Sequence, residues 1–107
     1  MISDEKRDKA LTYLAETDIS AAEARADVER QEYILKQIKA AAYLDSMEST
    51  IDAKKADVEI DQSVLDQKEN CIQSLIDYQG VANKRETARL IIEVWRSENA
   101  NRRQGGI

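Results

Sequence analysis

Arginine side chains near the C-terminal end of this chain are the residues best suited to a specific contact. Arg85, Arg89, Arg96 and Arg103 would fall on one narrow lane of a helix. The planar guanidinium group donates to phosphate oxygens in pairs, and the only tryptophan, Trp95, lies in the same segment. The residues expected to bind nucleic acid or a partner are the six cations Lys84, Arg85, Arg89, Arg96, Arg102 and Arg103.

The charge distribution sets this segment apart from the rest of the chain. Residues 80–107 hold six basic and three acidic residues, a net charge of +3, whereas the remainder holds 10 basic and 18 acidic residues, a net charge of −8. The segment is therefore a candidate for contact with phosphates. In an alternative reading, the same arginines pair with acidic residues of this chain or of a sister subunit, and Trp95 is a packing residue. The overall acidity argues against a nonspecific coat on nucleic acid.

Catalytic and metal-binding constellations are not found in the sequence. The chain contains no histidine and a single cysteine, Cys71, so it lacks zinc-site spacings and nucleophile–histidine pairs. Neighbouring acids such as Asp27 and Glu29 point in different directions on a helix, which is typical of a solvated surface. We expect no catalytic residue, no metal, no cofactor and no enzyme activity.

Composition predicts that almost the whole chain is helical. There is no proline, the first glycine is Gly80, and apolar residues recur at intervals of three and four. Ser3 suits a helix start, Ser20 and Asn83 each stand three residues before a glutamate, as in a capping box, and Gly80 suits a helix end. We therefore expect a single helical domain, residues 1–107. Its helices should cover about 4–16, 20–45, 50–79 and 84–100, followed by a flexible tail at 101–107.

The segment Ser46–Thr50 leaves two architectures open. If it turns, the second and third helices form an antiparallel hairpin; if it stays helical, residues 20–79 form a rod of roughly 90 Å at ~1.5 Å per residue. Three hydroxyl residues there offer hydrogen bonds that compete with the helix. We favour the hairpin.

The apolar residues predict self-association. A stripe on the second and third helices is expected to form a core or an oligomer contact and comprises Leu35, Ile38, Leu44, Ile51, Val58, Leu65 and Ile72. On the last helix the packing anchors are Trp95, Ile91 and Val94, which we expect to be buried together with Leu90. One hairpin and a short helix leave apolar surface uncovered. The expected fold class is all-α: an elongated helical hairpin or coiled-coil-like bundle with a short N-terminal helix and a capped C-terminal helix, forming a homodimer or a higher homo-oligomer.

Two stretches of the sequence resemble a known group of proteins. Ala10–Asp18, and the run from Asn83 to Gly105 that includes LIIEVWRSENANRRQG, are similar to segments of a family of small, largely uncharacterised proteins encoded by tailed bacteriophages and prophages. The resemblance covers roughly a third of the chain. It implies an accessory protein of the phage early region, made in the bacterial cytoplasm and linked to DNA replication or recombination.

Three hypotheses for the function follow. In the first, the chain is a helical accessory protein of phage DNA metabolism whose cations contact DNA or a DNA-bound protein. In the second, it inhibits a host defence or nuclease complex by protein–protein binding through an acidic surface. In the third, it is a purely structural oligomeric bundle. All three hypotheses predict a cytoplasmic protein without a membrane partner, since no apolar run is long enough to span a bilayer.

Overall fold

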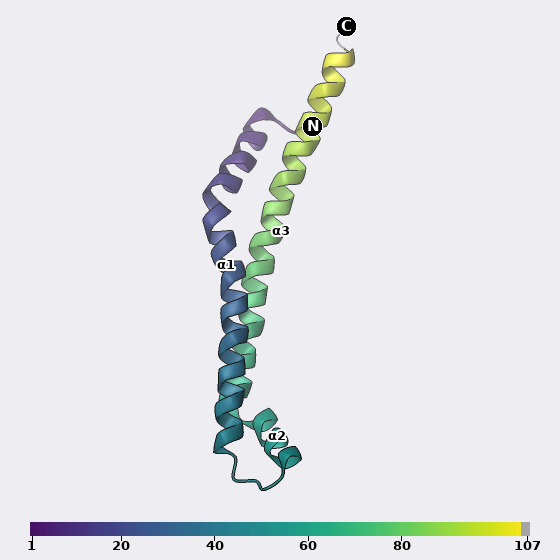
Figure 1. Ribbon diagram of the computed structural model, residues 1–107. Helices are drawn as coiled ribbons and strands as arrows, with labels where there is room; N and C mark the ends of the chain where they lie inside the picture. The colour runs from purple at the N-terminus through teal and green to yellow at the C-terminus, as the bar shows by residue number, and fades with distance from the viewer. Residues whose placement is uncertain (106–107) are drawn as a thin grey trace. The chain divides into compact units, whose positions relative to one another are not determined.

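The computed structural model describes residues 1–105 and contains three α-helices (Figure 1). They are α1 (Asp4–Asp45), α2 (Ile51–Ile60) and α3 (Gln62–Gly105), and no strand occurs among these residues. The expected all-α class is confirmed. The absence of proline explains why the helices are long, because no residue removes a backbone donor from the helical ladder.

The chain divides into two compact units. Unit 1 consists of Met1–Ala22 and the chain from Gln79 onward, and unit 2 consists of Glu23–Tyr78. In unit 1, α1 runs antiparallel to α3: Asp4 at the start of α1 contacts Trp95, and Asp18 contacts the earlier Arg85. The single domain expected over residues 1–107 stays a prediction.

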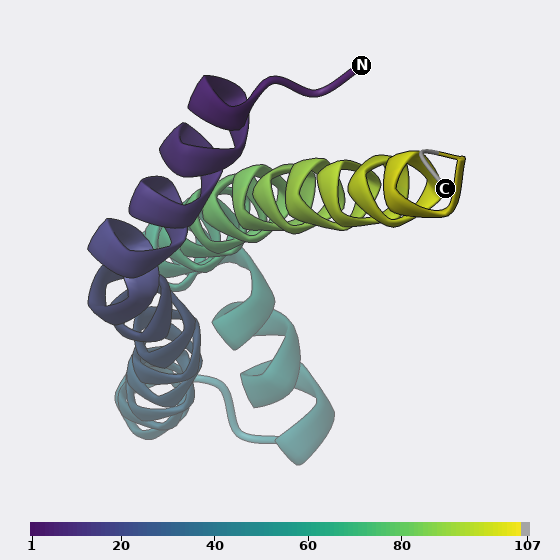
Figure 2. The same ribbon diagram turned by 90° about the horizontal axis from the view of Figure 1, so that it is seen from above.

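The predicted turn at Ser46–Thr50 is present in unit 2 and confirms the hairpin. These five residues are not helical, and the connection leads from the end of α1 to α2, as Figure 2 shows from above. Ser46 Oγ donates to Asp57 Oδ2 at 2.6 Å, and Thr50 Oγ1 accepts from Ala53 N at 3.1 Å. The hydroxyl groups thus hold the turn and cap α2.

The single helix expected over 50–79 is wrong, because Asp61 separates α2 from α3. Its backbone is extended, with φ −64° and ψ 130°. The Asp61 carboxylate accepts from the Ser63 hydroxyl, from Ser63 N at 2.9 Å and from Val64 N at 3.4 Å. The side chain therefore satisfies amides at the start of α3 that have no partner within the helix. The hydrogen bond from the Ser63 hydroxyl is the main reason that the pKa of Asp61 lies below its usual value.

The break expected between helices 4–16 and 20–45 is also wrong. α1 continues through this region because the hydroxyl groups there bond backward along the helix. Thr17 Oγ1 donates to Tyr13 O at 2.6 Å, and Ser20 Oγ donates to Thr17 O at 3.1 Å. A serine or threonine that bonds to a carbonyl of the preceding turn is compatible with a continuous helix.

The expected end at Gly80 and restart at Asn83 do not occur, since α3 runs through both. No glycine among the described residues has a positive φ, and Gln79 Nε2 donates to Asn83 Oδ1 at 2.8 Å within the helix. The segment expected as a flexible tail is helical from Asn101 to Gly105. The rest of that expected tail, residues 106 and 107, lies outside the described residues.

The buried apolar core of the described residues is small and is divided between the units. Ala10 and Ala88 are buried in unit 1, and Val58 and Val64 are buried in unit 2. The buried amide of Gln67 donates to both Gln31 O and Gln31 Oε1 at 2.9 Å, which fixes α3 against α1 in unit 2. Small residues and one buried amide network therefore set these helix contacts.

We expect Gly80→Ala to stabilise the protein. Gly80 is helical, its φ is not positive, and a Cβ placed there would meet no atom within 4 Å. Alanine is favoured over glycine inside a helix by about 0.8–1 kcal/mol, so thermal unfolding should shift upward by about 4 °C or more. Thermal unfolding followed by circular dichroism checks this. An unchanged or lower midpoint would mean that Gly80 lies in a close helix contact formed only in solution.

Candidate nucleic-acid interface

Arg85 is turned toward α1 within unit 1. Its Nη1 donates to Leu14 O at 2.8 Å and to Thr17 Oγ1 at 2.7 Å, and its Nη2 pairs with Asp18 Oδ1 at 3.3 Å. Only 12% of the side chain is exposed. The donors of Arg85 are therefore used inside the unit, and one of its partners is an acid of this chain, as in the alternative reading. A role of Arg85 in binding nucleic acid or a partner stays a prediction.

Trp95 joins α3 to the start of α1. Its indole Nε1 donates to Asp4 Oδ1 at 2.9 Å, and the Arg7 guanidinium carbon lies 4.2 Å from the ring centroid. One helical turn further on, Glu98 Oε2 accepts from Ile2 N at 2.8 Å. Because a cation covers the ring and the indole donor is occupied, Trp95 acts as a packing anchor in this structure rather than as a free stacking platform.

The other cations in the part of α3 that belongs to unit 1 remain at its surface. Arg89 is 56% exposed and, among residues 1–105, pairs only with Glu86 on its own helix, at 3.5 Å. Arg102 Nη2 lies 3.4 Å from the sulfur of Met1. The exposed side chains of Lys84, Arg96 and Arg103 make no ion pair with any carboxylate of residues 1–105. These three cations are therefore available to an outside anion.

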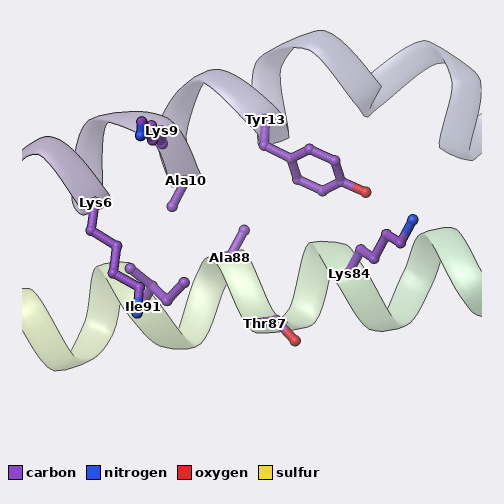
Figure 3. A pocket seen from close by; sticks show the side chains of 8 residues that line it. All are labelled: Lys6, Lys9, Ala10, Tyr13, Lys84, Thr87, Ala88 and Ile91. Carbon is purple, nitrogen blue, oxygen red and sulfur yellow. The ribbon is translucent and has the colours of Figure 1, made fainter. Parts of the chain in front are cut away.

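A groove lies between α1 and α3 in unit 1, with a volume of about 330 Å³ (Figure 3). Figure 3 shows the methyl groups of Ala10 and Ala88 facing each other, with Lys6 beside Ile91 at one end and Lys84 near Tyr13 at the other. Lys9 and Thr87 complete the lining. The sequence reading included Lys84 but missed Lys6 and Lys9, because no local pattern indicates which stretch of α1 lies opposite α3.

The other apolar assignments divide between the core and the surface. Of the predicted stripe, Val58 is buried and Leu35 and Ile38 are half-buried, whereas the exposed members are Leu44, Ile51, Leu65 and Ile72. Ile91 and Trp95 are half-buried. The expected burial of Leu90 and Val94 is wrong within one chain, since both are exposed. In each unit α1 covers only one side of α3, and the opposite side keeps its aliphatic residues in solvent.

Unit 2 carries a small network of ion pairs around Glu59. Its carboxylate lies 2.8 Å from Lys68 Nζ and 3.6 Å from Lys39 Nζ. The hydrogen bond from Lys68, followed by the charge of Lys39, holds the pKa of Glu59 below its usual value. The network joins all three helices of unit 2, because Lys39 belongs to α1 and Lys68 to α3.

Neither a metal site nor a membrane span emerges from the part of the chain that the structure describes. Histidine, cysteine and acidic side chains do not gather there in groups of three or more that could hold an ion. No helix within residues 1–105 combines the length and apolar character needed to cross a bilayer. Comparison of the chain with protein-family models, with curated proteins and with solved structures gave no match.

Proposed function

We propose that this protein is a non-enzymatic helical accessory of a bacteriophage that binds DNA through the exposed cations of α3, in phage DNA replication or recombination. The observation that supports the proposal is that Lys84, Arg96 and Arg103 are exposed and have no carboxylate partner in residues 1–105. The resemblance of the same segment to phage and prophage proteins supplies the biological setting.

The number and placement of the charges favour a local, salt-sensitive contact. A contact between a cation and a phosphate releases counterions, so each one adds about 0.9 to the slope of log affinity against log salt concentration on duplex DNA. Unit 2 holds 7 basic and 13 acidic residues, a net charge of −6, and it repels the phosphate backbone. The protein should therefore bind through the C-terminal part of α3 and should not coat DNA along its whole length.

The test is the double variant R96E/R103E, measured by fluorescence anisotropy with labelled single- and double-stranded DNA at several salt concentrations. We expect affinity at low salt to fall at least tenfold and the salt slope on duplex DNA to decrease by about 2, because two phosphate contacts are lost.

The matched control is K36E/K55E, which reverses two exposed lysines of unit 2. The control has the same net charge as R96E/R103E, so it separates loss of a contact from general repulsion. Equal binding by wild-type protein and R96E/R103E would contradict the proposal.

The acidic balance of unit 2 supports a second candidate, inhibition of a host defence or nuclease complex through an acidic surface. Exposed acids such as Asp66 and Glu69 lie on the α3 part of this unit. On this candidate, D66N/E69Q abolishes inhibition and R96E/R103E leaves it intact. If neither D66N/E69Q nor R96E/R103E changes DNA binding or inhibition, the remaining hypothesis is the purely structural homo-oligomeric bundle.

A further inference from the structure

The groove of unit 1 is built from the same pattern on both of its helices. α1 contributes Lys6, Ala10 and Tyr13, and α3 contributes Lys84, Ala88 and Ile91, each set at positions i, i+4 and i+7. These spacings place the three residues of each set on one face of a helix. The two alanines are 5% exposed, so their small side chains make the floor of the groove.

The antiparallel arrangement puts one lysine at each end of the groove. Lys6 stands beside Ile91, and Lys84 stands near Tyr13 (Figure 3). Seven residues of helix rise by ~10 Å, so the two lysines begin about that far apart along the helix direction. Neither side chain has a carboxylate partner in residues 1–105, whereas Lys9 is held by Glu5 at 3.2 Å.

From this geometry we propose that the groove docks an acidic amphipathic helix of a partner protein. An aliphatic side chain of that helix enters the apolar groove between Ala10 and Ala88, and two carboxylates, one on each side of it, pair with Lys6 and Lys84. Carboxylates seven residues apart on a helix are also separated by ~10 Å, with an aliphatic residue three or four positions after the first. The partner motif is therefore acid, aliphatic and acid at positions i, i+3 or i+4, and i+7.

The lining of the groove favours a protein segment over nucleic acid. A phosphate backbone could pair with the two lysines, but it has no aliphatic group to cover the apolar floor formed by Ala10, Ala88 and Ile91. The groove shares Lys84 with the proposed DNA contact, but neither Arg96 nor Arg103 lines it. The two surfaces can thus be tested separately.

The test is a selection from a library of random 18-residue peptides displayed against the full chain, with removal of peptides that also bind K6E/K84E. We expect the enriched peptides to carry two acids seven residues apart with an aliphatic residue between them. Synthesised singly, they should bind wild-type protein at least tenfold more tightly than K6E/K84E, and the unit 2 control K36E/K55E should bind like wild type. Circular dichroism checks that both variants remain helical.

Several outcomes would overturn the proposal: no enrichment, enriched peptides without acids, or equal binding to K6E/K84E. Because Lys84 is also a candidate phosphate contact, Lys6→Glu alone separates this inference from the DNA proposal. It should weaken peptide binding and leave the salt slope for DNA unchanged, whereas R96E/R103E should weaken DNA binding and leave peptide binding unchanged.

Discussion

Val64→Asp should unfold unit 2. Val64 is fully buried, with 0% of its surface exposed, and it lies in the first turn of α3, just after the Asp61 cap. The substitution removes about 2 kcal/mol of apolar burial and places a carboxylate in a fully buried position, where its desolvation is costly. A combined cost above about 4 kcal/mol is a large share of the stability of a small protein. Circular dichroism at 222 nm should show a marked loss of helix.

The neighbouring variant Leu65→Asp is the matched control. Leu65 lies about 100° further round the helix and is 41% exposed, so an aspartate there remains solvated. Its helical signal should stay close to that of wild type. Leu65 also belongs to the stripe proposed for self-association, and light scattering would show a lower mass for this variant if that proposal holds. Equal loss of helix in the two variants would contradict the assigned core.

Arg85→Ala should destabilise the protein by about 2 kcal/mol. The guanidinium group joins α3 to three acceptors on α1, and hydrogen bonds from a charged donor contribute about 1.5–3 kcal/mol. The expected loss lies within the range for one such bond because the acceptors are not all left unpaired: Thr17 keeps its bond to Tyr13 O, and Asp18 is largely exposed. Chemical denaturation with a linear extrapolation measures the difference.

Two further variants show whether the geometry of Arg85 matters. Arg89→Ala removes an arginine one turn later that pairs with Glu86 on the same helix, so we expect a loss of a few tenths of a kcal/mol. Arg85→Lys keeps the charge but not the planar fork, and its stability should fall between those of wild type and Arg85→Ala. If Arg85→Ala and Arg89→Ala have the same stability, the contacts of Arg85 with α1 contribute nothing measurable.

Much of the fold follows from the sequence, because local chemistry decides it. The lack of proline predicts long helices, and the hydroxyl residues of Ser46–Thr50 predict the turn. The same reasoning failed at residues whose side chains can either cap a helix or form hydrogen bonds within a continuous one. Ser20 and Asn83 are good capping residues, yet in the structure they bond along a continuous helix, whereas Asp61 stands in a helix-like pattern and caps α3. Packing of the neighbouring turns decides between these uses, and a local pattern does not contain that information.

The candidate interface was predicted less completely than the fold. Its position on α3 follows from the charge count of residues 80–107. The charge count does not predict that Arg85 turns toward α1, because its acceptors Leu14 and Thr17 lie 71 and 68 residues away in the chain. For the same reason Lys6 could not be assigned to the groove. Periodicity identifies the face of one helix but not the residues of a distant segment that meet it.

The contacts of unit 1 join residues far apart in the chain, and this affects the order in which the structure forms. Asp4 and Trp95 are 91 residues apart, whereas Gln31 and Gln67 in unit 2 are 36 residues apart. Closing a longer loop costs more entropy, about 0.6 kcal/mol for each doubling of its length. We therefore expect unit 1 to close after unit 2 during folding. A ligand that contacts both α1 and α3 binds only the closed form of unit 1, so its binding would stabilise that form against opening.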